Sequence, residues 1–181
     1  MNLPNRLTVV RLLLIPVFLI VATMKYQYSD YAAAAVFFTG AVTDGLDGYL
    51  ARKNRQETLF GNFMDPLADK ILVSAALIIL VEIGRLSGWM AAVIISREFA
   101  VTGLRAVAAA EGINITASVL GKIKTVTQII AILILFTGNY PFTHLRIPLG
   151  TLTMAVAVAF TVWSGMDYYF KTWRLLKKTG Y

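Results

Sequence analysis

The sequence predicts an all-α, polytopic membrane protein with six transmembrane helices and a short N-terminal juxtamembrane segment. Of its 181 residues, 57% are hydrophobic. They gather into six apolar runs, each close to the roughly 20 residues that cross a bilayer. Because backbone polar groups in lipid must be paired within a helix or a closed barrel, these runs are predicted to be helices. No repeat, low-complexity tract or flexible linker divides the chain, so residues 1–181 are predicted to form a single domain.

The first run contains Arg11 and Pro16, lacks a small-residue cleavage site after it and precedes five more runs. It is therefore predicted to be a retained anchor and not a signal peptide. The second run ends among carboxylates, and the third begins after another carboxylate, where Asp65 and Pro66 are typical of a helix start. The fourth encloses Arg97, the fifth has Lys122 and Lys124 near its beginning, and the sixth ends among aromatic and basic residues. The six runs cover residues 7–24, 31–50, 66–81, 89–110, 117–137 and 147–166.

The basic residues predict the orientation of the chain. With six spans, twelve Lys and Arg residues fall on one side of the membrane and three on the other. The positive-inside rule then places both termini and the carboxylates at the cytoplasmic face. The formal net charge of +7 lies next to membrane ends, which predicts membrane lipids as neighbours and no nucleic-acid partner. Without cysteine, disulfides and thiol catalysis are excluded.

Four carboxylates, Asp44, Asp47, Asp65 and Asp69, form the most informative feature of the chain. Asp44 and Asp47 are three residues apart and Asp65 and Asp69 are four apart, so each pair is predicted to share a helix face. Carboxylates repel one another at close range in a low dielectric unless they are protonated or cations lie between them. These oxygen ligands favour Mg²⁺ or Mn²⁺ over zinc or a redox metal, which indicates phosphate chemistry. Exposed charges or a structural ion-pair network are the alternative interpretation.

The segment DGLDGYLAR, followed by Gly61, Asp65 and Asp69, resembles the signature of the CDP-alcohol phosphatidyltransferase family at every fixed position. The resemblance spans the chain and implies six transmembrane helices and a homodimer. It implies transfer of a phosphatidyl group from CDP-diacylglycerol to an alcohol, with release of CMP. It also predicts a multi-pass protein of a bacterial inner or plasma membrane whose active site faces the cytoplasm; an organellar inner membrane is the alternative.

The resemblance assigns roles to individual residues. It implies that Asp44, Asp47 and Asp65 hold two divalent ions, and that Asp69 joins the second ion and is the catalytic base. Two such ions neutralise a pyrophosphate and orient phosphorus for attack. The predicted donor nucleotide site comprises Gly48, Ala51, Arg52 and Gly61, with Arg52 on the donor's phosphates. Close helix packing is the alternative role for Gly48 and Ala51.

Three shorter segments, NLPNRLTVVR, SREFAVTGLR and GKIKT, resemble the branch of the family that makes phosphatidylglycerophosphate from glycerol 3-phosphate. In that branch the opening segment helps to hold the nucleotide, which assigns Asn5 and Thr8 to the donor. Capping of the first helix is their alternative role.

Arg97 lies well inside the fourth apolar run, where an unpaired guanidinium is costly, so it is predicted to face a polar cavity. Arg105 follows two turns later, and Lys122 and Lys124 begin the next span, which predicts a cationic pocket for an acceptor that carries a phosphate. The alternatives are a pair between Arg97 and a neighbouring glutamate, and membrane anchoring for the lysines. Since Lys122 and Lys124 are two residues apart, a regular helix points them to opposite sides and one of them contacts the acceptor.

Two other functions remain open at this point. The first is the same transferase chemistry with inositol phosphate, serine or phosphatidylglycerol as the acceptor. The second is a divalent-cation transporter with a carboxylate selectivity ring, although the acids cluster at one membrane face beside basic residues. Trp89, Tyr140 and the group Tyr168, Tyr169 and Trp173 are predicted to lie in aromatic belts at the membrane interfaces.

Overall fold

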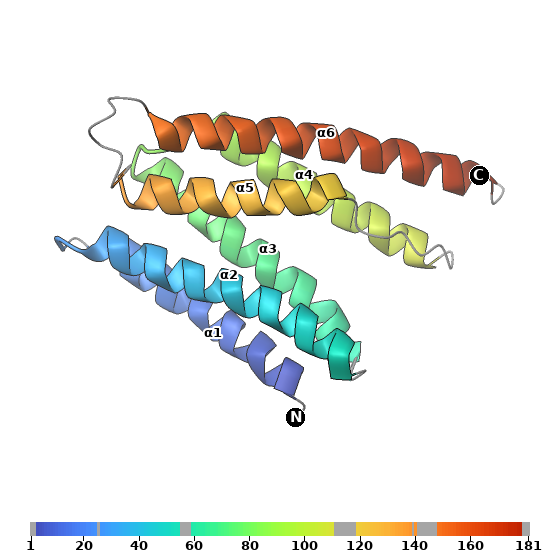
Figure 1. Cartoon of the computed structure of the whole chain (residues 1–181), viewed down its shortest axis with the longest axis horizontal. Helices are drawn as coiled ribbons and strands as arrows, with labels where there is room; N and C mark the ends of the chain where they lie inside the picture. Colours follow the sequence, from blue (N-terminus) through green and yellow to red (C-terminus); the bar gives the residue numbers. More distant parts are fainter. Residues whose placement is uncertain are drawn as a thin grey trace.

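The computed structural model describes residues 3–24, 26–54, 59–110, 119–138, 140 and 148–178; inside the helices, the side chains of residues 3–8, 44–54, 59–66, 110, 172 and 174–178 fall outside this description. The described residues form six helices and no strand, which confirms the all-α prediction (Figure 1). The helices are α1 (Leu3–Thr23), α2 (Ser29–Asn54), α3 (Leu59–Glu82), α4 (Gly88–Ala110), α5 (Val119–Phe136) and α6 (Leu149–Lys178).

Each predicted run falls on one helix, but α1, α2, α3 and α6 extend several residues beyond their apolar segments. The largest difference at a helix start is in α3, which begins at Leu59, so the prediction of a helix start at Asp65 and Pro66 is wrong. Likewise α2 continues to Asn54 and α6 to Lys178. Hydropathy marks only the part of a helix suited to lipid, whereas the backbone hydrogen bonds continue into polar sequence.

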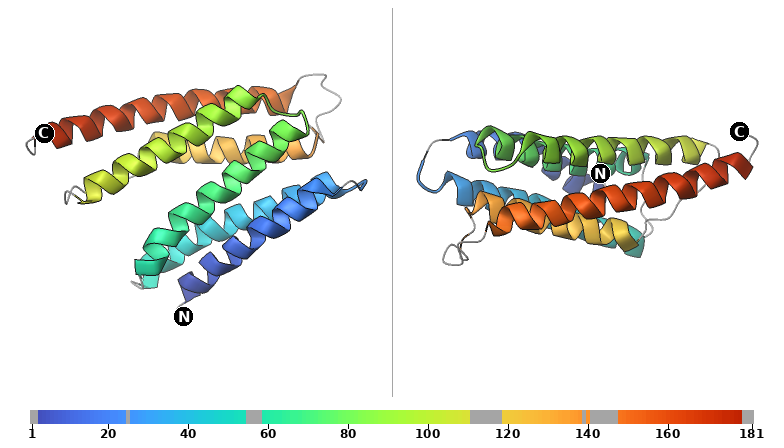
Figure 2. Two further views of the ribbon diagram at one scale, coloured as in Figure 1. Left: turned by 180° about the vertical axis from the view of Figure 1, so that it is seen from behind. Right: turned by 90° about the horizontal axis from the view of Figure 1, so that it is seen from above.

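Successive helices run in opposite directions, which places the start of α1 and the end of α6 at the same end of the bundle (Figures 1 and 2). We call this the terminal end. It also contains the end of α2, the start of α3, the end of α4 and the start of α5. The carboxylate-bearing helix segments and those that carry the predicted basic pocket therefore meet at one end, although they are distant in the sequence.

Helix α3 connects the two sides of the bundle, because it contacts α1 and α2 on one side and α4 and α5 on the other (Figure 2). Its Leu72, Ala76 and Leu77 belong to the buried core. Three fully or almost fully buried aromatic rings add to that core from α1, α2 and α5: the centroid of Phe18 lies 6.2 Å from that of Phe37 and 5.7 Å from that of Phe136. The core thus fixes α3 beside the helices that line the terminal end.

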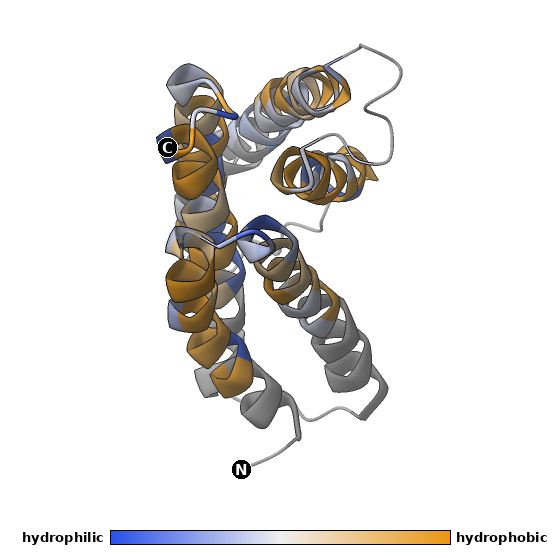
Figure 3. Ribbon diagram, turned by 90° about the vertical axis from the view of Figure 1, so that its left-hand side faces the viewer, coloured by the Kyte–Doolittle hydropathy of each residue, from blue (hydrophilic) through white to orange (hydrophobic). Residues whose placement is uncertain are grey.

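Many large apolar side chains are exposed on the outside of the bundle. Figure 3 shows that hydrophobic residues make up much of the coloured helices. Leu13 and Trp163 are 62% and 65% exposed, and they belong to different helices. Two segments, Val119–Phe136 and Leu149–Lys171, are long and apolar enough to cross a bilayer among the residues that the structure describes. The charged residues of α4 are Arg97, Glu98 and Arg105, and all three line the cavity described below. These features are consistent with a membrane protein.

At the opposite end, Arg85 joins three helices. Its NH1 donates to the carbonyls of Leu135 (3.2 Å) and Phe136 (2.7 Å), which end α5, and its NH2 pairs with Asp30 in the first turn of α2. A cation at a helix C-terminus and a carboxylate at an N-terminus both complement the helix dipole. Gly84, with a φ of 73°, ends α3 and directs the chain to Arg85.

Candidate functional site

A cavity of about 410 Å³ lies towards the terminal end of the bundle, between α3, α4, α5 and α6. Asp69 of α3 lines it beside four of the predicted basic residues, so the structure brings together five site residues from three helices. In all, five basic and two acidic side chains line the cavity: Lys70, Arg97, Arg105, Lys122 and Lys124, with Asp69 and Glu98. The excess of positive charge suits an anionic ligand.

Gly40 explains how α2 approaches α3 near the carboxylates. A Cβ atom at this position would overlap the end of the Leu72 side chain, so a larger residue would require Leu72 or the helices to shift. Gly40 lies one turn before Asp44, and Leu72 lies three residues after Asp69. The close contact therefore lies next to the helix segments that carry the four carboxylates.

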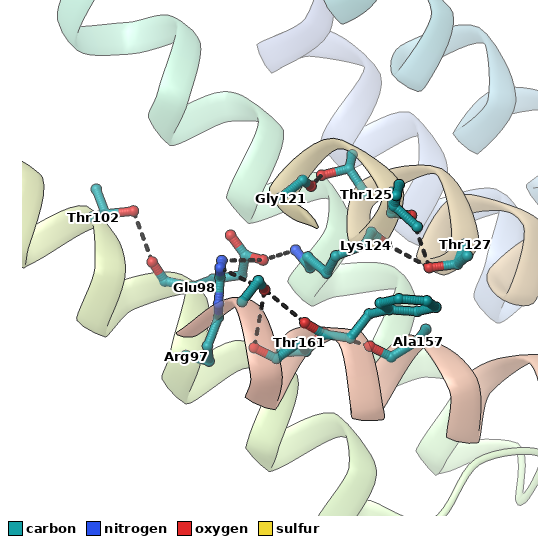
Figure 4. A network of polar contacts seen from close by, with 12 residues as sticks. Arg97, Glu98, Thr102, Gly121, Lys124, Thr125, Thr127, Ala157 and Thr161 are labelled. Carbon is teal, nitrogen blue, oxygen red and sulfur yellow. Dashed lines mark hydrogen bonds and ion pairs between the residues drawn. The ribbon is translucent and has the colours of Figure 1, made fainter. Parts of the chain in front are cut away.

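Glu98 links two cations of the cavity, Arg97 and Lys124 (Figure 4). Its Oε1 accepts a hydrogen bond from Lys124 Nζ and lies 3.8 Å from Arg97 NH1. Lys124 is only 4% exposed, and a buried ammonium group needs a counter-charge to remain charged. Glu98 supplies that charge and holds Lys124 of α5 against α4. The predicted pairing of Arg97 with a glutamate is also present, within a cavity-lining group.

Arg97 also contacts α6. Its NH2 donates to Ser164 Oγ at 2.9 Å, and Ser164 in turn donates to the Phe160 carbonyl at 2.6 Å. A Cβ atom at Gly165 would come within 3.1 Å of Arg97 Cγ, so glycine leaves room for the arginine beside α6. These contacts hold the guanidinium at the cavity wall, as predicted from its place inside an apolar run.

The mouth of the cavity is formed by more exposed groups. Arg105 is exposed, and its guanidinium carbon lies 5.9 Å from the ring centroid of Tyr168, a distance at which cations and aromatic rings attract. Lys122 is exposed whereas Lys124 is buried, as their two-residue spacing predicts, yet both line the cavity. Membrane anchoring alone therefore does not explain why Lys122 and Lys124 both line the cavity.

The remaining predicted residues are placed only by their helices, because their side chains lie outside the described part of the structure. Asn5 and Thr8 are in α1, and the others are near the end of α2 or the start of α3. That second group comprises Asp44, Asp47, Gly48, Ala51 and Arg52 in α2, and Gly61 and Asp65 in α3. Among the side chains that are described, no group of three possible metal ligands occurs. Of the four carboxylates, Asp69 alone is described; it is half-buried.

The prediction from sequence did not assign Lys70 or Tyr168 to the cavity, and it considered Glu98 only as an alternative partner of Arg97. Lys70 follows Asp69 directly, and Glu98 follows Arg97, so adjacency to a candidate residue was the available signal. Tyr168 was placed in an aromatic belt, but it is 5% exposed and lines the cavity. Its neighbour Tyr169 instead stacks on Trp173 with centroids 6.1 Å apart, and both are exposed.

Comparison with known proteins identifies relatives over almost the whole chain. The family described as CDP-alcohol phosphatidyltransferase matches residues 1–163. A protein of Bacillus subtilis (strain 168), named CDP-diacylglycerol–glycerol-3-phosphate 3-phosphatidyltransferase, is 48% identical, and the alignment covers 97% of each chain. Proteins of the same name from Pseudomonas fluorescens and Escherichia coli (strain K12) are 42% and 38% identical. Their alignments cover 99% and 92% of this chain, and 94% and 92% of the relatives.

Proposed function

The chain belongs to the CDP-alcohol phosphatidyltransferase family, and we propose that it transfers the phosphatidyl group of CDP-diacylglycerol to glycerol 3-phosphate, releasing CMP. The names of relatives that are 35–48% identical describe this reaction. Phosphatidylglycerophosphate, a precursor in phospholipid biosynthesis, is the second product. Membership of this family also excludes the alternative of a divalent-cation transporter, because the family consists of transferase enzymes.

The positive charge of the cavity is the observation that supports glycerol 3-phosphate as the acceptor. Arg97, Arg105, Lys122 and Lys124 surround a space of about 410 Å³ that Asp69 also lines. Glycerol 3-phosphate carries a phosphate and two hydroxyl groups, and guanidinium and ammonium groups are strong donors to phosphate oxygens. In the proposed complex the acceptor's phosphate lies on these basic groups and one of its hydroxyls lies at Asp69. Zwitterionic serine, which has no phosphate, would leave this positive charge without a matching anion.

Asp69 is the proposed catalytic base. As the acceptor hydroxyl attacks phosphorus, a carboxylate oxygen of Asp69 receives the hydroxyl proton. The arrangement of Arg97 and Lys124 around Glu98 fixes the positions of the groups that hold the acceptor, and correct positioning supplies much of the rate enhancement in phosphoryl chemistry. Asn5, Thr8, Gly48, Ala51, Arg52 and Gly61 are the proposed donor nucleotide site.

The family depends on divalent metal ions, and we propose two Mg²⁺ or Mn²⁺ ions here. Asp44, Asp47, Asp65 and Asp69 would hold them: the set consists of hard oxygen donors, as these ions prefer. The Gly40–Leu72 contact brings the helices that carry the four residues together. Bound divalent ions neutralise pyrophosphate charge and stabilise the departing CMP.

The proposed setting is a cell membrane, with six spans and the terminal end at the cytoplasmic face. The alternating helix directions, the exposed apolar side chains and the basic residues of the terminal end support this orientation. A bacterial inner or plasma membrane fits the sources of the relatives. We also propose a homodimer, as the family resemblance implies.

The test is CMP release by purified protein supplied with CDP-diacylglycerol and Mg²⁺. We compare glycerol 3-phosphate with inositol phosphate, serine, phosphatidylglycerol and no acceptor. Release that depends on glycerol 3-phosphate, with phosphatidylglycerophosphate as the lipid product, is the expected result. Dependence on another acceptor overturns the proposed substrate and keeps the family reaction. A chelator should stop release, and added Mg²⁺ or Mn²⁺ should restore it.

A further inference from the structure

Gln128 is a buried polar residue of α5 that the proposed reaction does not use. It lies one turn beyond Lys124 and is 2% exposed. Its side-chain Nε2 and Oε1 are both buried, and neither has a hydrogen-bond partner among the residues that the structure describes. An amide can donate two hydrogen bonds and accept two, so the full capacity of this group is available.

A buried amide without partners is unfavourable. Leaving a buried donor or acceptor without a partner costs about 1–3 kcal/mol, whereas an apolar side chain of similar shape avoids that cost. Within an apolar helix such as α5 there is no bulk water to compensate. The position therefore indicates a ligand atom or an ordered water that completes the amide's hydrogen bonds.

A second, smaller cavity of about 30 Å³ lies against Gln128. Val73 and Ile129 complete its wall together with residues that also line the main cavity, so it is an inner extension of that cavity. The shared residues are Asp69, Lys70, Glu98, Lys124 and Thr125. A water requires about 10–15 Å³ on this measure, so the extension holds one or two oxygen atoms and is too small for a phosphate.

A hydroxyl group fits both the size and the chemistry of this extension. Its proton can be donated to Gln128 Oε1, and its oxygen can accept from Nε2, which uses both ends of the neutral amide. The phosphate of an acceptor has a better place among the basic side chains of the main cavity. Asp69 lines both spaces, so an attacking hydroxyl at Asp69 lies next to the inner extension.

We propose that Gln128 binds the hydroxyl group of the acceptor that does not react, and that water occupies this position before the acceptor enters. The inference rests on the proposed function, which supplies an acceptor with two hydroxyl groups. Gln128 is thereby a specificity-determining residue: it favours an acceptor with neighbouring hydroxyls over a phosphorylated alcohol with only one.

The experiment compares kcat/KM for glycerol 3-phosphate and for 3-hydroxypropyl phosphate, which lacks the middle hydroxyl, in the wild-type enzyme and in Gln128→Met. Methionine keeps the length of the side chain and removes its polar groups. In the wild type, glycerol 3-phosphate should be preferred by about tenfold or more, because the analogue leaves the amide without that partner. In Gln128→Met the preference should fall to within about threefold, chiefly through loss of activity with glycerol 3-phosphate.

Equal losses with both acceptors would overturn the proposal and assign Gln128 to an ordered water alone. An unchanged preference would overturn it as well. Because the amide has no protein partner in the described structure, Gln128→Met should unfold at the same temperature as the wild type or higher. A marked fall in the unfolding temperature would show that the Gln128 amide does have a hydrogen-bond partner in the protein. Wild-type turnover with glycerol 3-phosphate tests the proposed function separately, since it does not involve the variant.

Discussion

The two ends of the bundle each place an arginine beside a carboxylate, but they balance the charges differently. At the opposite end, Arg85 pairs with Asp30, and its remaining contacts are the carbonyls that end α5. At the terminal end, Glu98 faces both Arg97 and Lys124, and further basic side chains line the same cavity. Arg85 is held by one carboxylate and two carbonyls, whereas Arg97 lies in a group with excess positive charge.

This difference separates a structural arginine from a ligand-binding one. Both residues are next to glutamate or aspartate, so proximity to an acid does not distinguish them. The decisive features are the number of cations for each carboxylate and the presence of a cavity. Arg85 is expected to contribute to stability, and Arg97 to the binding of an anionic acceptor.

Asp69→Asn should have the largest effect, because it removes the proposed base and a metal ligand at nearly constant volume. We expect CMP release to fall by at least about 10³-fold while the thermal unfolding temperature stays close to that of the wild type. Turnover assays and thermal unfolding of the detergent-solubilised protein measure the two quantities. Turnover equal to that of the wild type would contradict the proposed mechanism.

Arg97→Ala should raise the KM for glycerol 3-phosphate by about 10–100-fold, as expected for loss of a charge-assisted hydrogen bond to phosphate. The KM for CDP-diacylglycerol should change little. Initial rates measured while each substrate is varied separately give both constants. If only the KM for CDP-diacylglycerol changes, Arg97 belongs to the donor site and the acceptor site has been placed wrongly.

The helices and their order could be predicted from the sequence because an apolar run of about 20 residues marks each of them. Hydropathy predicted all six helices but missed the start of α3 at Leu59, since the pair Asp65 and Pro66, typical of a helix start, lies inside this helix. The family signature identified Asp69, and the cost of charge in an apolar run identified Arg97 as a cavity residue. Asp44 and Asp47 were chosen by the same signature, and their role remains a prediction.

The pairing of Glu98 with Lys124 could not be predicted, because it joins residues of different helices that are 26 positions apart. Residue spacing describes one helix face at a time, whereas this contact depends on how α4 and α5 pack. Tyr168 shows the same limit: its residue type suits a membrane interface, but its orientation on α6 buries it beside Arg105. Gln128 gave no sequence signal, since only its burial without a partner distinguishes it.

Glu98→Gln should sharpen the comparison, because it removes the counter-charge of Lys124 and keeps an oxygen atom that can accept from it. The acceptor's phosphate then supplies the negative charge that keeps Lys124 protonated, so we expect the KM for the acceptor to fall by about 2–5-fold. Inorganic phosphate should also inhibit more strongly, and added salt should reduce both effects. A higher KM would instead show that Glu98 acts mainly by fixing the positions of Arg97 and Lys124.

Arg85→Ala is the matched control for Arg97→Ala and should have the smallest effect on catalysis. It removes the pair with Asp30 and the two contacts to the end of α5, so the unfolding temperature should fall by about 2–6 °C. The acceptor KM should stay within about twofold of the wild-type value, because Arg85 lies away from the cavity. Asp30→Asn should lower the unfolding temperature less, since Arg85 keeps the carbonyl contacts. A rise in KM comparable to that of Arg97→Ala would mean that the two ends are coupled and that the division between a structural and a binding arginine is wrong.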